Sequence, residues 1–300
     1  MASDRAIQSP LLQAKADDAG FVKVAKITPR TMLIDVVTGV LAPLPVVPLI
    51  AVVDASIINS VNGDRTPVMQ GMREGFKMIF TQPHKYVTSP RWMKISGLCW
   101  MVYGGTYAAA NLAYSYIDAH KLSGLNASLL KVSTSSSFNI GLTLVKDVML
   151  VGIIAELAKE AGNTSGPAKK GYVPMRSRLC FITRDVMTMI AAFVLSKTFG
   201  EWIARRTEGW LTERQALFAA TLTLPVMIQP FSTVLHLYAL NYAKDQTLHG
   251  DRMIASMRSN YFAATLSRMT RILPAVGMGN NLRAELRNYT YRTAEARRWI

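Results

Sequence analysis

The amino-acid sequence predicts an all-α membrane protein whose six transmembrane helices form three pseudo-repeats, each of two helices plus a short surface helix. Half of the 300 residues are apolar and 18% are charged, a composition unlike that of an ordinary soluble domain. Six apolar runs have about the 20-residue length that a helix needs to cross a bilayer. Polar linkers follow the first, third and fifth runs, whereas shorter connections follow the second and fourth. Composition, run length and linker pattern therefore indicate the same architecture.

Charged residues inside the apolar runs indicate that the helices surround a common interior. The runs cover residues 32–60, 92–120, 129–157, 179–204, 216–242 and 261–286. Charges at membrane depth are costly and normally face a bundle interior or a water-filled cavity. We place six charged residues there, namely Asp54, Asp147, Arg184, Asp185, Lys197 and Arg271. We therefore expect a bundle around a central axis.

The linkers over residues 62–91, 158–178 and 244–260 are polar, and the first contains an amphipathic stretch. Its apolar residues at positions 68, 72, 76, 79 and 80 fall on one face of a helix. This pattern predicts a short helix over residues 68–80 that lies on the membrane surface. We expect a helix of this kind in each pseudo-repeat.

A short motif late in each odd-numbered run indicates the length of the repeat. Asp54, Asp147 and Ser232 occupy the same position in three aligned segments, at spacings of 93 and 85 residues. Each spacing is near a third of the chain, as a threefold repeat requires. The predicted organisation is an N-terminal tail (1–31), three repeats (32–121, 122–206 and 207–289) and a basic C-terminal tail (290–300).

The formal net charge of +15 indicates an acidic partner. Because the Lys and Arg residues are scattered between apolar runs, we expect anionic phospholipid such as cardiolipin, and no nucleic acid. Cys99 and Cys180 lie in separate runs and the four histidines are dispersed, a pattern that predicts no disulfide, no metal site and no cofactor. We find no constellation of acid, base and nucleophile, so we do not expect an enzyme.

Three segments of the chain resemble the mitochondrial carrier family. Pro230, Phe231 and Ser232 resemble the proline–aromatic–acid turn of the family's odd-numbered helices. Residues 268–279 resemble the start of its sixth helix, and residues 118–121 match one acid–x–x–base half of its cytoplasmic-side network. The resemblance covers residues 33–289. It implies the mitochondrial carrier fold, with the surface helices on the matrix side.

The resemblance also assigns site residues, most of which lack the family's charges. The degenerate matrix-gate positions, where the family has a proline, an acid and a base in each repeat, are Val52, Asp54, Ile57, Val145, Asp147, Leu150, Pro230, Ser232 and Leu235. The implied cavity contacts are Gly105, Thr188, Met189 and Arg271, of which Arg271 is interpreted either as an anion contact or as a structural arginine that bonds the backbone or Asp185. The implied remnant of the cytoplasmic-side network is Asp118, Lys121 and Glu201. Because aliphatic residues fill all three base positions, we expect no ring of ion pairs within the chain.

From this loss of charge we expect a non-transporting structural or accessory subunit of an inner-membrane respiratory assembly. Cytochrome c oxidase or a supercomplex is the favoured host, and its other subunits are the expected partners. The alternative is a divergent but active mitochondrial carrier that exchanges a small anionic or amphipathic metabolite. Both hypotheses place the chain in the mitochondrial inner membrane as a multi-pass protein. Basic residues are in excess over residues 62–91, which favours the matrix side for that linker and the intermembrane space for both termini.

Overall fold

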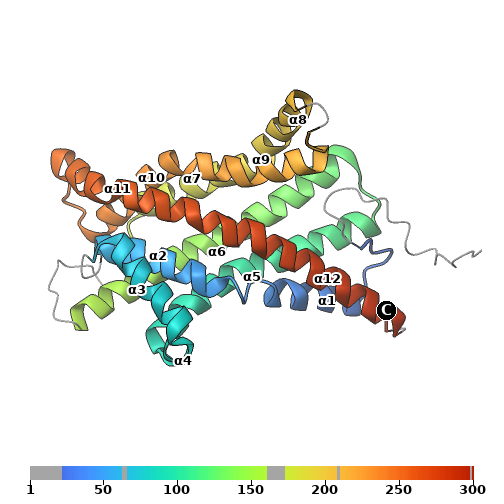
Figure 1. Ribbon diagram of the computed structural model, residues 1–300, viewed down its shortest axis with the longest axis horizontal. Helices are drawn as coiled ribbons and strands as arrows, with labels where there is room; N and C mark the ends of the chain where they lie inside the picture. Colours follow the sequence, from blue (N-terminus) through green and yellow to red (C-terminus); the bar gives the residue numbers. More distant parts are fainter. Residues whose placement is uncertain (1–21, 63–65, 161–172, 208–209, 298) are drawn as a thin grey trace, which may run out of the picture.

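The chain folds into a bundle of long helices. A computed structural model describes residues 22–62, 66–160, 173–207, 210–297 and 299–300, and all regular structure in them is helical (Figure 1). The prediction of an all-α fold is confirmed. The elements are α1 (Pro29–Leu41), α2 (Val47–Asn62), α3 (Val68–Thr81), α4 (Pro83–Thr88), α5 (Pro90–Ala119), α6 (Gly124–Glu160), α7 (Met175–Met189), η1 (Ile190–Leu195), α8 (Ser196–Arg206), α9 (Glu213–Met227), α10 (Gln229–Lys244), α11 (Gly250–Ile272), η2 (Leu273–Met278) and α12 (Gly279–Ala296).

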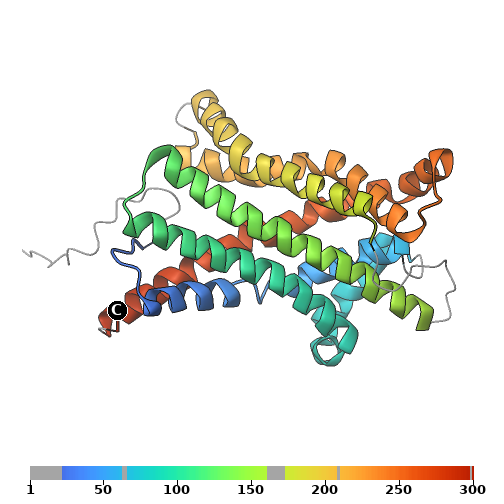
Figure 2. The same ribbon diagram turned by 180° about the vertical axis from the view of Figure 1, so that it is seen from behind.

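All of these elements except α3 and α4 form six long helical columns, and successive columns run in opposite directions along the bundle (Figures 1 and 2). Four columns are interrupted: α1–α2, α7–η1–α8, α9–α10 and α11–η2–α12. The other two, α5 and α6, are continuous. Within the described part of the chain, two helical stretches are long and apolar enough to cross a membrane, Asn126–Glu156 and Gln215–Lys244.

Proline accounts for most of the interruptions. Pro43 and Pro45 lie in the turn between α1 and α2, and Pro225 and Pro230 flank the break at Ile228 between α9 and α10. Pro274 lies in the π-helical segment η2. Proline has no backbone N–H and its ring clashes with the preceding turn, so a helix bends or ends there. Segment η1 is π-helical without a proline, and π-helical segments are frequent at functional sites.

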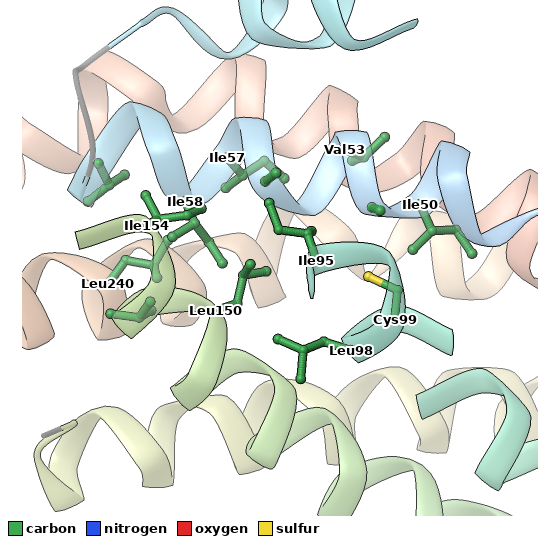
Figure 3. Packing of buried hydrophobic residues seen from close by; sticks show 14 of the residues in the cluster. Ile50, Val53, Ile57, Ile58, Ile95, Leu98, Cys99, Leu150, Ile154 and Leu240 are labelled. Carbon is green, nitrogen blue, oxygen red and sulfur yellow. The ribbon is translucent and has the colours of Figure 1, made fainter. Parts of the chain in front are cut away.

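The apolar core lies where α2, α5, α6 and α10 meet (Figure 3). Ile57 from α2 and Leu150 from α6, two of the predicted gate positions, are fully buried in this core. Ile95 and Leu240 complete it from α5 and α10. These aliphatic side chains therefore fill space between helices, as small or branched residues do in packed membrane bundles.

The predicted surface helix over residues 68–80 is present as α3, which is amphipathic and packs on α2. Gly75 permits the close approach, because a Cβ atom there would lie 2.6 Å from Val52 Cγ1. The third linker differs from the prediction. Residues 250–260 form no separate surface helix, since α11 begins at Gly250 and continues without a break to Ile272. In the second linker, residues 161–172 lie outside the described residues.

Candidate functional site

A closed ring of polar and charged side chains links five helices inside the bundle. Among the described residues, its contacts run from α2 to α6, then to α7, α10 and α11, and back to α2. We call this the central ring; its members are Asp54, Lys146, Asp147, Arg184, Asp185, Gln229, Ser232, His236, Arg268 and Arg271.

Each carboxylate oxygen of Asp54 on α2 accepts a hydrogen bond from a cationic side chain. Lys146 Nζ on α6 donates to Oδ2 at 2.5 Å, and Arg271 on α11 donates to Oδ1. Lys146 Nζ also lies 2.8 Å from Asp147 Oδ1. The Asp54, Lys146 and Asp147 side chains are 2–7% exposed, whereas the Arg271 side chain is 21% exposed. Arg271 is therefore the charged group through which water most readily reaches this part of the ring.

Arg184 on α7 connects the two sides of the ring. Its Nη2 donates to Asp147 Oδ2 at 2.7 Å, and its Nε donates to Asp185 Oδ1 at 2.9 Å. Its Nη1 donates to His236 Nδ1 at 2.7 Å. Because a guanidinium can only donate, His236 Nδ1 must accept. The imidazole of His236 therefore carries its N–H proton on Nε2 and is neutral.

Arg268 on α11 completes the ring with neutral partners. Its Nε donates to Gln229 Oε1 at 3.0 Å and its Nη2 donates to Ser232 Oγ at 3.3 Å. Gln229 is itself fixed, because its Nε2 donates to the Pro225 carbonyl at 2.7 Å. With three carboxylates and four cations, the central ring carries a formal charge of +1.

The expectation that no ring of ion pairs forms within the chain is wrong. It assumed that a cation must follow each acid at the third position, where this chain has Ile57, Leu150 and Leu235. The cations come instead from the residue beside Asp147 and from two other helices. The suggested pairing of Arg271 with Asp185 is also incorrect, since Arg271 pairs with Asp54.

A second buried polar cluster lies where α1, α5 and α12 meet, away from the central ring. Arg287 Nε on α12 donates to Asp35 Oδ1 on α1 at 2.8 Å, and both side chains are completely buried. Ser115 on α5 donates its hydroxyl to Asp35, and Tyr291 donates its hydroxyl to Asp35 Oδ1 at 3.2 Å. We call these four residues the terminal cluster. Arg287 lies sixteen positions after Arg271 along the column α11–η2–α12, so the terminal cluster is several helical turns away from the central ring.

The segment between the two polar layers is tightly packed. Tyr107 on α5 donates its hydroxyl to the Ala275 carbonyl in η2 at 2.7 Å. This side chain therefore satisfies a backbone carbonyl of the π-helical segment. Gly105, a predicted cavity contact, lies close to Leu142, because a Cβ atom there would be 2.5 Å from Leu142 Cδ1. Thr188, another predicted contact, donates its hydroxyl to the Arg184 carbonyl at 3.1 Å. Met189 ends α7 and is partly buried.

The structure does not bring the predicted cytoplasmic-side residues together. Asp118 accepts the Val24 N–H at 3.1 Å, so it holds the described part of the N-terminal tail. Glu201 lies 3.9 Å from Arg205 on its own helix, with both side chains largely exposed. Lys121 is exposed in the turn after α5, with a positive φ of 50°.

The remaining gate positions differ from one another in burial and in their contacts. Val52 is buried and Val145 is 46% exposed. The Pro230 carbonyl accepts the Tyr261 hydroxyl at 3.0 Å. Ser232 is buried in the central ring, and Leu235 is partly buried. Among the residues that the structure describes, no cluster of His, Cys, Asp and Glu could hold a metal ion.

Sequence reasoning singled out six members of the central ring, namely Asp54, Asp147, Arg184, Asp185, Ser232 and Arg271, but missed Lys146 and Gln229. Asp35 lies in the first apolar run, so the criterion that found Asp54 could have found it as well. Arg268 was noted only as part of a motif, and His236 only as a dispersed histidine. Their role in the ring depends on contacts between helices, for which the sequence holds no local signal.

Comparison with known proteins gives one match. A family model described as "Probable citrulline exporter" matches residues 38–290. No curated protein and no solved structure matches the chain.

This match corrects the resemblance to the mitochondrial carrier family and the conclusions drawn from it. The hypothesis of a non-transporting subunit of cytochrome c oxidase or a respiratory supercomplex is wrong, because the matched family is one of exporters. It rested on missing gate cations, and the central ring supplies those cations from other positions. The expectation of a membrane protein that is not an enzyme agrees with the match. The mitochondrial location depended on the overturned resemblance and has no further support.

Proposed function

This chain belongs to the probable citrulline exporter family, and we propose that it exports citrulline, a small zwitterionic amino acid, across a membrane. The observation that carries the proposal is the extent of the match, because residues 38–290 include every member of the central ring. Citrulline has an α-carboxylate, an α-ammonium group and a neutral ureido side chain. A buried ring with both carboxylates and cations offers partners for each end of such a zwitterion.

We further propose that the six helical columns are the transmembrane spans and that residues 32–121, 122–206 and 207–289 are three repeats of two spans each. The alternating direction of the columns supports this topology. An even number of spans places both ends of the chain on one side, and Arg30 Nη1 donates to the Trp299 carbonyl at 2.5 Å there. The excess of basic residues over 62–91 favours the positive-inside face for α3 and α4.

The mechanism that we propose is alternating access between the central ring and the terminal cluster. Both layers are closed in this structure, and each ties together helices that a solute must pass. A solute can cross without leakage only if one layer opens while the other stays closed. The interruptions in four of the six columns lie where such helices can bend.

The formal charge of the central ring supports selectivity for a neutral amino acid. Arginine and ornithine resemble citrulline in length but carry one more positive charge. A charge of +1 at about 6 Å repels a second one by about 3 kcal/mol at an effective dielectric constant of 20. That difference corresponds to roughly 100-fold weaker binding of the cationic amino acids.

Efflux from proteoliposomes tests the proposed function. Purified protein is reconstituted in liposomes loaded with radiolabelled L-citrulline, L-arginine, L-ornithine or L-glutamine. We expect citrulline efflux well above that of protein-free liposomes, and little efflux of the two cationic amino acids. Arg205→Gln, which alters an exposed pair outside both layers, should export citrulline at the wild-type rate. Citrulline efflux no faster than that of protein-free liposomes would refute the proposal.

A crosslink tests alternating access separately. The double variant Asp35→Cys/Arg287→Cys places two thiols where α1 and α12 now form a buried ion pair. Oxidation should lock the terminal cluster and stop efflux, and a reducing agent should restore it. Efflux that persists in fully crosslinked protein would show that this end does not open during transport.

A further inference from the structure

Arg268 differs from the other cations of the central ring because it has no carboxylate partner among the residues that the structure describes. Lys146, Arg184 and Arg271 each contact at least one aspartate. The hydrogen-bond partners of Arg268 among the described residues are the amide oxygen of Gln229 and the hydroxyl of Ser232, both neutral. The Arg268 side chain is nevertheless buried, with a relative exposure of 3%.

A buried guanidinium without an anion is expensive. Neutral hydrogen bonds offset only part of its desolvation, and an apolar residue of similar volume would stabilise a helix interface at lower cost. An ionisable residue at membrane depth is therefore a candidate for a functional role. The cost of Arg268 is explained if an anion occupies the site during part of the transport cycle.

The neighbours of Arg268 hold its guanidinium in one orientation. Gln229 is anchored by its bond to the Pro225 carbonyl, and Ser232 donates to Gln229 Oε1 at 3.1 Å. These contacts occupy Nε and one N–H of Nη2. Nη1 makes no hydrogen bond to the described residues, so the Nη1–Nη2 edge keeps donors for a second acceptor. That edge has the geometry that binds the two oxygens of a carboxylate.

Arg268 carries the excess positive charge of the central ring, because three carboxylates balance the three other cations. Arg184 and Arg271 are close enough to Arg268 to act on it electrostatically, as are Asp185 and Asp54. Both aspartates already hold cations of their own. A carboxylate that reaches Arg268 therefore meets the one cation of the ring whose charge no aspartate of the ring balances.

We propose that Arg268 binds the α-carboxylate of the transported amino acid, with Gln229 and Ser232 as positioning residues that orient its guanidinium. This inference rests on the proposed export of an amino acid, and it assigns one chemical group of that substrate to one side chain. The ligand class is an α-amino acid with a free carboxylate.

A ligand-by-mutant cycle tests the assignment. Equilibrium binding of L-citrulline and of its α-amide, in which a neutral amide replaces the carboxylate, is measured with purified protein in lipid nanodiscs. Wild-type protein should bind citrulline at least tenfold more tightly than the amide. Arg268→Gln should weaken citrulline binding and abolish this preference, because the carboxylate then has no guanidinium to bind.

Two further variants keep the outcome decisive. Gln229→Glu places a permanent carboxylate beside Arg268 and should also abolish the preference for citrulline, even if Arg268→Gln does not fold. Arg271→Gln is the matched control, since it lowers the formal charge of the ring by the same unit but should retain a preference for citrulline. A preference that survives in Arg268→Gln, or that is lost in Arg271→Gln alone, would overturn the inference.

Glutamine and glycine, each paired with its α-amide, separate the two proposals. Binding of citrulline with an unchanged preference in Arg268→Gln would contradict the carboxylate site and leave the proposed function standing. Carboxylate-dependent binding of another amino acid but not of citrulline would contradict the proposed substrate and support the site. Absence of binding for the whole panel would contradict both.

Discussion

Replacing Arg184 by methionine removes the cation that has the most contacts within the central ring. The guanidinium contacts Asp147, Asp185 and His236, and its side chain is 2% exposed. Methionine has a similar length and is apolar, so the substitution removes the charge with little change in volume. Asp147 would retain Lys146, but Asp185 would be left buried without a cation contact from the described part of the chain.

The expected loss of stability is large because of that orphaned carboxylate. Breaking one partner of a buried pair costs about 3–5 kcal/mol, which for a chain of this size corresponds to a drop in Tm of roughly 10 °C. Arg271→Met should cost less, about 1–2 kcal/mol, because Asp54 keeps Lys146 and the Arg271 side chain is 21% exposed. Arg205→Met, which removes an 82% exposed side chain, should leave Tm unchanged within error.

Thermal unfolding of the three variants in one detergent, followed by tryptophan fluorescence, measures this order directly. The double variant Arg184→Met/Asp185→Asn should recover part of the lost Tm, because asparagine removes the unpaired charge. If Arg184→Met lowers Tm no more than Arg205→Met does, or if Asp185→Asn brings no recovery, the energetic reasoning for the ring is wrong.

Two other predictions concern packing and a loop carboxylate. Gly39→Ala should lower Tm, because a Cβ atom at Gly39 would clash with the Ala108 backbone on the neighbouring helix. Gly97→Ala should leave Tm unchanged, since no described atom lies within 4 Å of a Cβ atom there. Equal Tm values for the two variants would contradict the close approach at Gly39. The Thr247 hydroxyl and then its backbone N–H, at 2.7 and 2.9 Å, hold the pKa of Asp245 below its ordinary value. Thr247→Val should therefore raise the Asp245 pKa in an NMR titration of the carboxyl carbon, and an unchanged titration would contradict this. Any stabilisation from the lowered pKa is present at neutral pH and is lost as the pH falls through the folded-state value.

The sequence contained enough information for the helices and too little for their contacts. Apolar runs and the amphipathic pattern of residues 68–80 predicted the helical columns and α3, because hydrophobic periodicity is a local signal. The start of α11 at Gly250 was missed, since residues 250–260 are polar and look like a linker. A helix that extends beyond the apolar layer has no compositional mark to distinguish it from a loop.

The central ring shows the same limit more sharply. Asp54 and Asp147 were recognisable as charges in apolar runs, but their partners lie 92 and 37 positions away, at Lys146 and Arg184. The terminal cluster joins Asp35 to Arg287 across 252 positions. Spacing within one helix says nothing about such pairs, so reasoning from the third position after each acid led to the wrong conclusion about the ring.

The position of α10 in the central ring has a mechanical consequence. Its links to α7 and α11 join a cation to a neutral histidine, amide or hydroxyl, whereas α2, α6, α7 and α11 all take part in contacts between opposite charges. Swinging α10 outward therefore separates no anion from a cation of the central ring, and displacing any other helix of the ring does. The break at Ile228 supplies a pivot at the base of this same helix. Moving α10 away from the central ring therefore requires less electrostatic work than moving any other helix of the ring.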